Sequence, residues 1–102
     1  MFEVQETETF SKWFAELKDI QARAKVLVRV KRLALGNFGD VGPVGDGVSE
    51  LRIHYGPGYR VYVVQFGQSV VILLGGGDKS TQKRDIAVAK ALAKELREQK
   101  NG

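Results

Sequence analysis

Three strand-like stretches joined by very short turns constrain the fold of this chain more than any other feature of its sequence. They are residues 48–55, 59–66 and 69–74. Apolar and polar residues alternate in the first stretch, and Gly56-Pro57-Gly58 and Gly67-Gln68 leave room only for tight turns between the strands. Neighbouring strands joined in this way must run antiparallel. The third stretch is apolar throughout, which predicts a central strand covered on both faces and ended by Gly75-Gly76-Gly77-Asp78.

A helix with an aromatic face is predicted ahead of these strands. Residues 2–5 alternate as a short strand would, and Thr7 or Thr9 can cap a helix that follows. The aromatic residues of this helix recur at intervals of three and four, so they share one face. A small domain needs such rings for burial, which favours core packing over base stacking. The face consists of Phe10, Trp13, Phe14 and Leu17.

Two further helices are predicted, one on each side of the strands in the sequence. One runs from Ile20 to Leu35 and stops at Gly36-Asn37. The other is capped by Ser80 or Thr81 and continues for roughly 15–18 residues. The apolar stripe of the earlier helix is expected to consist of Ile20, Ala24, Leu27, Val30 or Lys31, and Ala34. The apolar seam of the later helix is expected to consist of Ile86, Ala89, Ala93 and Leu96.

The segment between the second helix and the strands is rich in glycine. Residues 36–47 contain five glycines and one proline, which predicts a loop because glycine adopts positive φ angles at little cost. The segment lacks the Gly-Lys-Ser or Gly-Lys-Thr ending of a phosphate-binding loop. The predicted order is therefore β-α-α-β-β-β-α, an α+β fold in a single domain that covers residues 1–102.

Composition narrows the classes of function. No cysteine is present, which excludes disulfides, thiol catalysis and thiolate metal sites, and the sequence predicts neither a cofactor nor a metal. No run of about 18 apolar residues predicts a membrane span. The acidic start at residues 1–6 is unlike a signal peptide, so a cytoplasmic protein without membrane contact is expected.

Positive charge is concentrated in two of the predicted helices. The net charge is +4; residues 18–35 hold six basic residues against one acidic residue, and residues 79–102 hold seven against three. Such blocks are either solvated helix faces or binding surfaces for a polyanion. The polyanion could be RNA, a ribosome, DNA or an acidic protein, and the charge pattern alone leaves these alternatives open.

Four stretches of the sequence resemble the RelE/ParE toxin superfamily and, within it, the HigB-like addiction module killer proteins. They are the loop of residues 39–47, Glu50-Leu51-Arg52, Gly58-Tyr59-Arg60-Val61-Tyr62 and the segment of residues 76–82. The resemblance extends over essentially the whole chain. It implies a RelE-like fold, in which helices pack on one face of a small twisted antiparallel sheet. The first strand is then added to the C-terminal strands, and the opposite, concave face is open for a ligand.

The same resemblance implies the toxin of a type II toxin–antitoxin module. The best-studied members are ribosome-dependent, metal-independent endoribonucleases that cleave messenger RNA (mRNA interferases), whereas ParE-like members poison DNA gyrase and are not nucleases. The fold alone does not decide between these activities. The implied partners are a helix-turn-helix antitoxin encoded next to the toxin, mRNA on the ribosome, and operator DNA only through the antitoxin complex.

The resemblance places basic residues where RelE nucleases bind the scissile phosphate. Arg52 and His54 are two apart on one strand and therefore share a face. Arg60 matches the strand arginine of the family, and Lys79 falls close to a basic residue that follows the last strand. Arg52, His54, Arg60 and Lys79 are therefore predicted to be catalytic. The three cationic residues would stabilise the phosphorane, and His54 would transfer a proton.

RNA-binding residues are expected beside this set. Tyr62 lies on the same strand face as Arg60 and could stack on a base, whereas Tyr55 and Tyr59 are expected to pack. The basic residues expected to contact RNA from the helix of residues 20–35 are Lys25, Arg29 and Arg32.

Some of these assignments have alternatives. His54 could be an ordinary exposed strand histidine, and Arg60 could form an ion pair with Asp78 or Glu50. Many RelE nucleases also carry a tyrosine near the C-terminus, but residues 83–87 contain neither tyrosine nor histidine. The general base is therefore left open between His54, Asp78 and ribosomal groups, and a gyrase poison remains the alternative function.

Overall fold

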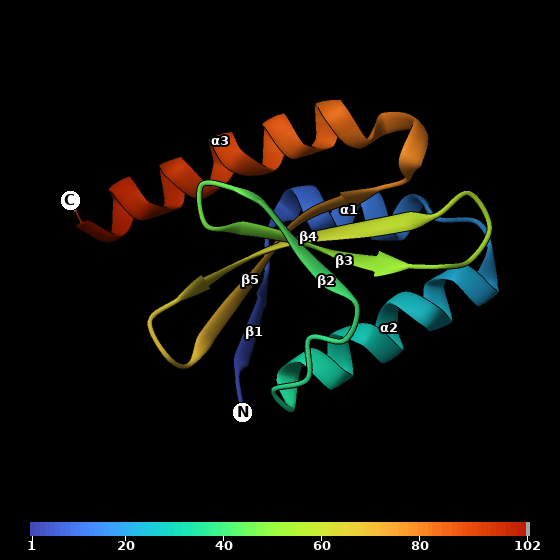
Figure 1. The fold of residues 1–102 in the computed structure, drawn as a ribbon, viewed down its shortest axis with the longest axis horizontal. Helices are drawn as coiled ribbons and strands as arrows, with labels where there is room; N and C mark the ends of the chain where they lie inside the picture. Colours follow the sequence, from blue (N-terminus) through green and yellow to red (C-terminus); the bar gives the residue numbers. More distant parts are fainter. Residues whose placement is uncertain (102) are drawn as a thin grey trace.

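A five-stranded sheet with helices on both faces forms the architecture of residues 1–101, the part of the chain that the computed structural model describes (Figure 1). The elements are β1 (Glu3–Glu6), α1 (Glu8–Glu16), α2 (Ile20–Ala34), β2 (Val41–Gly45), β3 (Val48–Ile53), β4 (Tyr59–Phe66), β5 (Val70–Gly77), a 3-10 turn η1 (Lys79–Thr81) and α3 (Gln82–Asn101). The α+β class predicted from the sequence is confirmed. Within residues 1–101, no helix combines the length and the apolar composition needed to cross a membrane.

The strand order in the sheet is β1-β5-β4-β3-β2. The pairs β2–β3, β3–β4 and β4–β5 are antiparallel, as the short turns predict. The first strand is added to the C-terminal strands as expected, but β1 pairs with β5 in parallel. The sheet is therefore mixed rather than wholly antiparallel.

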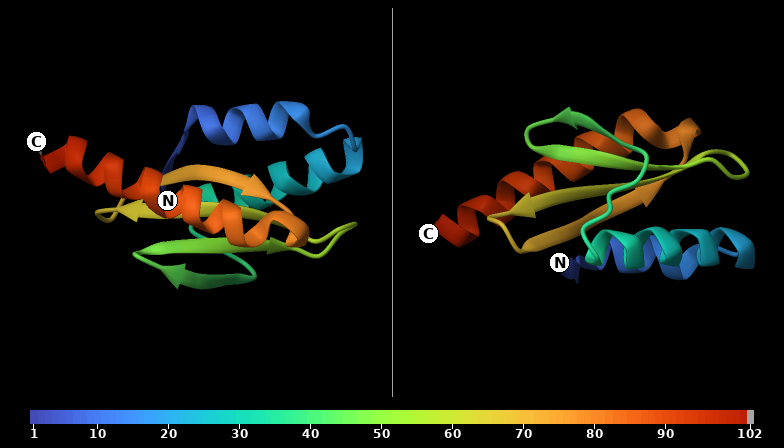
Figure 2. Two further views of the ribbon diagram at one scale, coloured as in Figure 1. Left: turned by 90° about the horizontal axis from the view of Figure 1, so that it is seen from above. Right: turned by 60° about the horizontal axis from the view of Figure 1, so that its bottom comes forward.

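Helices cover both faces of the sheet. One core cluster contains Phe10 of α1 and Val26 of α2 against β3, β4 and β5, and the other contains Ala89 and Ala93 of α3 against the opposite face. Figure 2 shows the sheet between α3 and the pair α1 and α2. The expectation that all helices pack on one face and leave the other open is therefore wrong. The physical reason is that β4 and β5 carry apolar side chains on both faces, and α3 removes the second face from water.

The third apolar stretch forms a central strand, as predicted. β5 lies between β1 and β4. Val71 and Leu73 belong to the cluster beneath α1 and α2, whereas Ile72 and Leu74 belong to the cluster beneath α3. Alternation along this strand thus divides its apolar residues between two cores.

The first helix is as predicted, but the second helix buries a row of residues different from the predicted apolar stripe. Thr7 caps α1 by accepting a hydrogen bond from Phe10 N at 3.2 Å, and the aromatic face packs into the core. In α2 the buried residues are Ala22, Val26 and Leu33. Of the predicted stripe, Val30 packs against the core, whereas Ile20 is 81% exposed. The small side chain of Ala22 allows the helix to approach the sheet closely, so this row is buried in place of the predicted one.

The apolar seam predicted for the last helix is confirmed, but the predicted N-cap residue is wrong. Ala89 and Ala93 are buried, and Ile86 and Leu96 pack against the same cluster. The N-cap of η1 is Asp78, whose Oδ1 accepts a hydrogen bond from Ser80 N at 2.8 Å. The chain then continues directly into α3.

The glycine-rich segment contains a strand where a loop was predicted. β2 pairs with β3 through Val41–Leu51, Gly42–Glu50 and Pro43–Ser49. It is an edge strand, where a proline without a backbone N–H is tolerated. Asp46 and Gly47 have φ angles of 56° and 76°, the backbone of a tight hairpin turn whose twist matches the flanking strands.

Glycines also continue β5 beyond its predicted end. Gly75, Gly76 and Gly77 pair with β4 instead of ending the strand. A Cβ atom on Gly76 would collide with the ring of Trp13, and one on Gly77 would collide with the carboxylate of Asp85. Glycine is therefore needed here because α1 and α3 approach the strand too closely for a side chain.

Replacing Gly76 with Ala is expected to destabilise the protein by roughly 1–3 kcal/mol, because the Trp13 ring must move to admit the new methyl group. Gly75→Ala is the matched control, since its Cβ would meet Thr9 Cγ2 at an ordinary 3.5 Å. Urea unfolding of both variants measures the difference. Equal loss of stability in the two variants would show that Trp13 does not enforce this glycine.

Candidate functional site

A hollow of about 500 Å³ lies between α2 and the edge of the sheet where β2 and β3 meet the loop before β2. It is lined by Ala24, Lys25, Val28, Arg29, Arg32, Gly39, Asp40, Arg52, Ile53 and His54. Five of these residues are basic, and they come from α2 and from the end of β3. We call this group of lining residues the α2 hollow.

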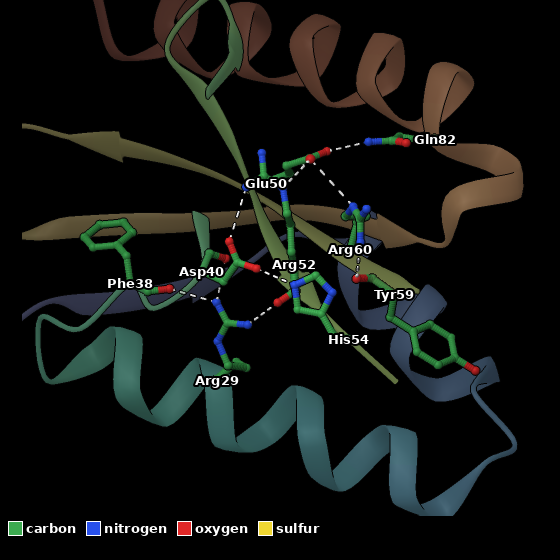
Figure 3. A network of polar contacts seen from close by, with 9 residues as sticks. All are labelled: Arg29, Phe38, Asp40, Glu50, Arg52, His54, Tyr59, Arg60 and Gln82. Carbon is green, nitrogen blue, oxygen red and sulfur yellow. Dashed lines mark hydrogen bonds and ion pairs between the residues drawn. The ribbon is translucent and has the colours of Figure 1, made fainter. Parts of the chain in front are cut away.

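Asp40 connects the two sides of the α2 hollow (Figure 3). Its carboxylate pairs with Arg52 through Nη1 at 3.2 Å and with the Nε2 atom of His54. Its backbone oxygen accepts hydrogen bonds from Arg52 N and from Arg29 Nη2, both at 2.9 Å. The end of β3, the loop and α2 therefore meet at one acidic residue.

The shared face of Arg52 and His54 is as predicted. Both side chains reach Asp40, and both remain accessible, with 35% of the Arg52 side chain and 67% of the His54 side chain exposed. The His54 Nε2 atom faces the carboxylate, so Nε2–H donates to Asp40 when the ring is neutral. The other ring nitrogen, Nδ1, is then free to accept a proton.

Arg29 holds the loop before β2 against α2. Its guanidinium donates to the backbone oxygens of Phe38 and Asp40, both at 2.9 Å, and to that of Arg52. Partial burial lowers the pKa of Arg29 from its ordinary value, opposed by the charge of Asp40. Carbonyl oxygens do not neutralise the guanidinium, so Arg29 adds positive charge to the α2 hollow while it organises the loop.

Lys25 and Arg32 lie on exposed positions of α2 along the same hollow. The Lys25 ammonium lies 5.3 Å from the centre of the Tyr55 ring, within the range of a cation–π interaction. The structure therefore brings the three α2 residues predicted to contact RNA together with Arg52 and His54. Their role in binding RNA remains a prediction.

Arg60 occupies an internal ion pair. The residue is 7% exposed, and its Nε lies 3.6 Å from Oε2 of Glu50, which is 4% exposed. The same Glu50 oxygen pairs with Arg52 Nε at 3.0 Å, and Oε1 accepts from Gln82 Nε2 at 2.8 Å (Figure 3). Arg60 is thus not open to a phosphate, which corrects the prediction that it contacts the scissile group. Of the two alternatives considered, the ion pair with Glu50 is the one formed.

Tyr62 is also unavailable to RNA. The residue is 0% exposed, and its hydroxyl group has no hydrogen-bond partner among the described residues. Burial raises the pKa of Tyr62 far above its ordinary value, with the nearby charge of Glu50 adding to the effect. The prediction that this ring stacks on a base is wrong, because α3 covers the sheet face on which it lies.

Lys79 lies outside the α2 hollow. It is exposed in η1, and its side-chain carbons pack beside Gly58 in the turn between β3 and β4. Arg52, Arg60 and Lys79 therefore do not form one open surface, contrary to the expectation. Asp78, considered as a substitute base, caps η1 through hydrogen bonds from the Ser80 backbone and hydroxyl.

Sequence reasoning missed the acidic residues that organise the basic ones. Asp40 was part of a predicted glycine-rich loop, and Glu50 was considered only as a partner of Arg60. The alternation of Glu50 and Arg52 along β3, with Arg60 opposite Arg52 in the register, is a signal that could have identified the Glu50 network. No comparable signal marks Asp40. Across residues 1–101, no cluster of histidine and carboxylate side chains could hold a metal ion.

The network around Asp40 is expected to lose its contribution to stability at low pH. The hydrogen bond with His54 lowers the pKa of the Asp40 carboxyl, Arg52 lowers it further, and burial opposes them. A lowered folded pKa means that this stability is present above the unfolded value, about 4, and is lost as the pH falls through the folded value. Urea unfolding should therefore show that wild type has a higher free energy of unfolding than Asp40→Asn at pH 6. This difference should disappear below pH 4. A difference in the free energy of unfolding that stays constant over this pH range would contradict a stabilising role of the ionised Asp40 carboxylate.

The chain matches the model of a protein family and is similar in sequence to a bacterial protein. The family model described as "Phage derived protein Gp49-like (DUF891)" matches residues 12–101. A protein of Haemophilus influenzae, described only as uncharacterised, is 53% identical over 94 residues, which cover 92% of this chain and 95% of that protein. The matched region includes every residue of the α2 hollow.

Proposed function

The chain belongs to the Gp49-like family of phage-derived proteins, a family associated with toxin–antitoxin systems, and from this premise we propose that it is the toxin of a type II module that cleaves mRNA on the ribosome. It would then act as a metal-independent endoribonuclease of the RelE/ParE type, close to the HigB-like proteins. The observation that carries the proposal is the α2 hollow, where Asp40 joins His54 to Arg52 within a ring of basic side chains.

The charge of the hollow suits an RNA backbone. Lys25, Arg29 and Arg32 surround an opening whose single described carboxylate, Asp40, is already paired with Arg52 and His54. The excess positive charge therefore remains available to phosphate groups. Guanidinium groups are well suited to this task because their planar donors match two phosphate oxygens at once.

His54 and Arg52 supply the chemistry of the proposed cleavage. The Nδ1 atom of His54 would take the proton of the 2′-hydroxyl, while Asp40 stabilises the imidazolium that results. The 2′-oxygen then attacks phosphorus, and the bond from phosphorus to the 5′-oxygen breaks. That oxygen takes a proton from a water molecule, and the hydroxide left behind takes the proton that His54 had accepted. Arg52 would stabilise the negative charge on the phosphorane. The products are a 2′,3′-cyclic phosphate and a 5′-hydroxyl end.

The proposal includes the partners that such a toxin requires. A helix-turn-helix antitoxin encoded next to this chain would neutralise it in the cytoplasm, and operator DNA would be bound only through their complex. Lys79 lies outside the α2 hollow and is assigned no step in this cleavage. Its role stays a prediction.

Induction of the protein in bacteria, followed by mapping of transcript ends, tests the proposal. We expect growth arrest with new ends inside translated regions, and none in a reporter transcript whose ribosome-binding site and start codon have been removed. Growth arrest with intact mRNA would overturn the nuclease assignment.

A second candidate is a gyrase poison of the ParE type. It is favoured by the absence of tyrosine and histidine from residues 83–87 and by the length of α3, which spans 20 residues. In that case induction would produce gyrase-dependent DNA breaks and a DNA-damage response while transcripts remain intact. The transcript experiment therefore separates the two candidates.

A further inference from the structure

The solvent-facing side of α2 carries a row of apolar residues that the core of the protein does not use. The row consists of Ile20, Ala24, Leu27, Val28 and Leu35. Separations of three, four and seven residues place them on one side of the helix, and the four larger side chains are between 44% and 81% exposed. The row extends for about 22 Å at the rise of an α-helix. We call these five residues the outer row of α2.

The outer row makes α2 apolar on two sides. Ala22, Val26 and Leu33 are buried on its other side, toward the sheet. Within residues 1–101, no helix or strand lies outside α2 to cover the outer row (Figure 1). A helix that is apolar on both sides is typical of a helix buried from both sides, and a contiguous exposed apolar patch marks an interaction surface. The outer row therefore calls for an occupant from another molecule.

The charge around the outer row indicates the chemistry of this occupant. The 15 residues of α2 include five basic residues and no acidic residue. Lys31 lies on the same side as the outer row, and Lys25 and Arg32 lie along its flank. Among residues 1–101, none of these three side chains lies within 4.0 Å of a carboxylate. An aliphatic row beside unneutralised cations is complementary to an amphipathic helix that carries acidic residues next to its apolar side.

We propose that the outer row of α2 docks an acidic amphipathic helix of a partner protein. The inference rests on the function proposed above, under which this partner is the antitoxin encoded next to the chain. A second copy of the chain fits less well, because pairing of α2 with itself would bring together ten basic side chains and no acidic one from the two helices. RNA also fits less well, since the outer row offers no aromatic ring on which a base could stack.

The outer row borders the α2 hollow. Ala24 and Val28 belong to the row and also line the hollow, next to Lys25 and Arg32. Acidic side chains of a helix docked on the row would therefore reach these two cations and compete for them with RNA phosphates. Docking on the row and neutralisation of the hollow would then be two effects of one helix.

Leu27→Gln tests this inference, with Val88→Gln as the matched control. Both residues are aliphatic, lie in a helix and are 47% exposed, but Val88 belongs to α3. Neither residue lines the α2 hollow, so both variants should remain toxic. The affinity of each protein for the purified product of the neighbouring gene is measured by calorimetry from 50 to 300 mM salt. We expect Leu27→Gln to bind at least about 30-fold more weakly and the control to match wild type. The affinity of wild type should fall as the salt concentration rises.

Ile20→Gln provides a second variant at the end of the outer row. Its side chain is 81% exposed, so the substitution leaves the core unchanged. It should weaken binding in the same direction as Leu27→Gln. Both variants should arrest growth even when the partner is produced with them, whereas the partner should neutralise Val88→Gln. Matching thermal unfolding of the three variants excludes a folding defect.

Each outcome decides the inference. Equal affinities of Leu27→Gln and Val88→Gln would overturn it and leave the proposed function intact. Binding that does not weaken with salt would overturn the acidic character of the partner. A wild-type dimer in sedimentation that dissociates in Leu27→Gln would assign the outer row to a second copy instead. Growth arrest with intact mRNA would overturn the proposed function, while selective loss of binding by Leu27→Gln would still support the outer row as the docking site.

Discussion

Replacing Arg52 with Ala is expected to abolish growth arrest and to slow mRNA cleavage by roughly 10²–10³-fold, the effect of removing one donor to a transition-state oxyanion. The guanidinium is fixed from two sides, by Glu50 at 3.0 Å and by Asp40 at 3.2 Å, and yet is 35% exposed. It is therefore preorganised and still accessible to a phosphate. Toxicity assays after induction, with quantified transcript ends, measure the effect.

The control for this substitution is Arg84→Ala, which removes a guanidinium from an exposed position of α3 outside the α2 hollow. It should remain toxic. Arg52→Lys should recover only part of the activity, because an ammonium group lacks the planar set of donors. Full toxicity of a folded Arg52→Ala protein would exclude the α2 hollow as the cleavage site.

Replacing Glu50 with Gln is expected to destabilise the protein by about 3–5 kcal/mol, because Arg60 would remain buried without a compensating charge. Glu50 is 4% exposed and accepts contacts from Arg52, Arg60 and Gln82, which belong to three different elements. For a domain of this size, such a loss lowers the midpoint of thermal unfolding by roughly 12 °C or more. Calorimetry or circular dichroism measures this shift.

A double variant separates charge from packing at this position. Adding Arg60→Met to Glu50→Gln removes the unpaired buried cation and should restore most of the lost stability. If Glu50→Gln lowers stability by less than about 1 kcal/mol, the pair is more hydrated than its burial indicates and Arg60 could be free to move. The role of Arg60 as an internal ion pair would then have to be abandoned.

Helices and strands were predicted well from the sequence wherever they depend on local features, namely the periodicity of apolar residues and the length of the turns. The apolar residues of β5 indicated cover on both faces, and α3 supplies the second cover; the one-face arrangement came from the family resemblance and ignored this signal. β2 was missed because glycine content outweighed Asp46-Gly47, a strong hairpin signal. The buried row of α2 could not be chosen from periodicity alone, since two rows have helical spacing and the sheet decides between them.

The candidate site was less predictable because it depends on contacts between distant segments. Strand alternation predicts that Arg52 and His54 lie on the same face of β3, and in the structure both side chains reach Asp40. Burial of Tyr62 depends on where α3 packs, and the ion pair of Arg60 depends on the neighbouring strand. Asp40 is brought to His54 by a loop whose path no local pattern determines.

The rate of cleavage of ribosome-bound mRNA under single-turnover conditions, compared between wild type and His54→Gln, tests the central claim most directly. Proton transfer by a positioned side chain contributes typically 10²–10⁴-fold, so the variant should cut that much more slowly with unchanged ribosome affinity. The fragments released by wild type should end in a 2′,3′-cyclic phosphate and a 5′-hydroxyl. Equal rates for the two proteins, or mRNA that stays intact with wild type, would contradict the account.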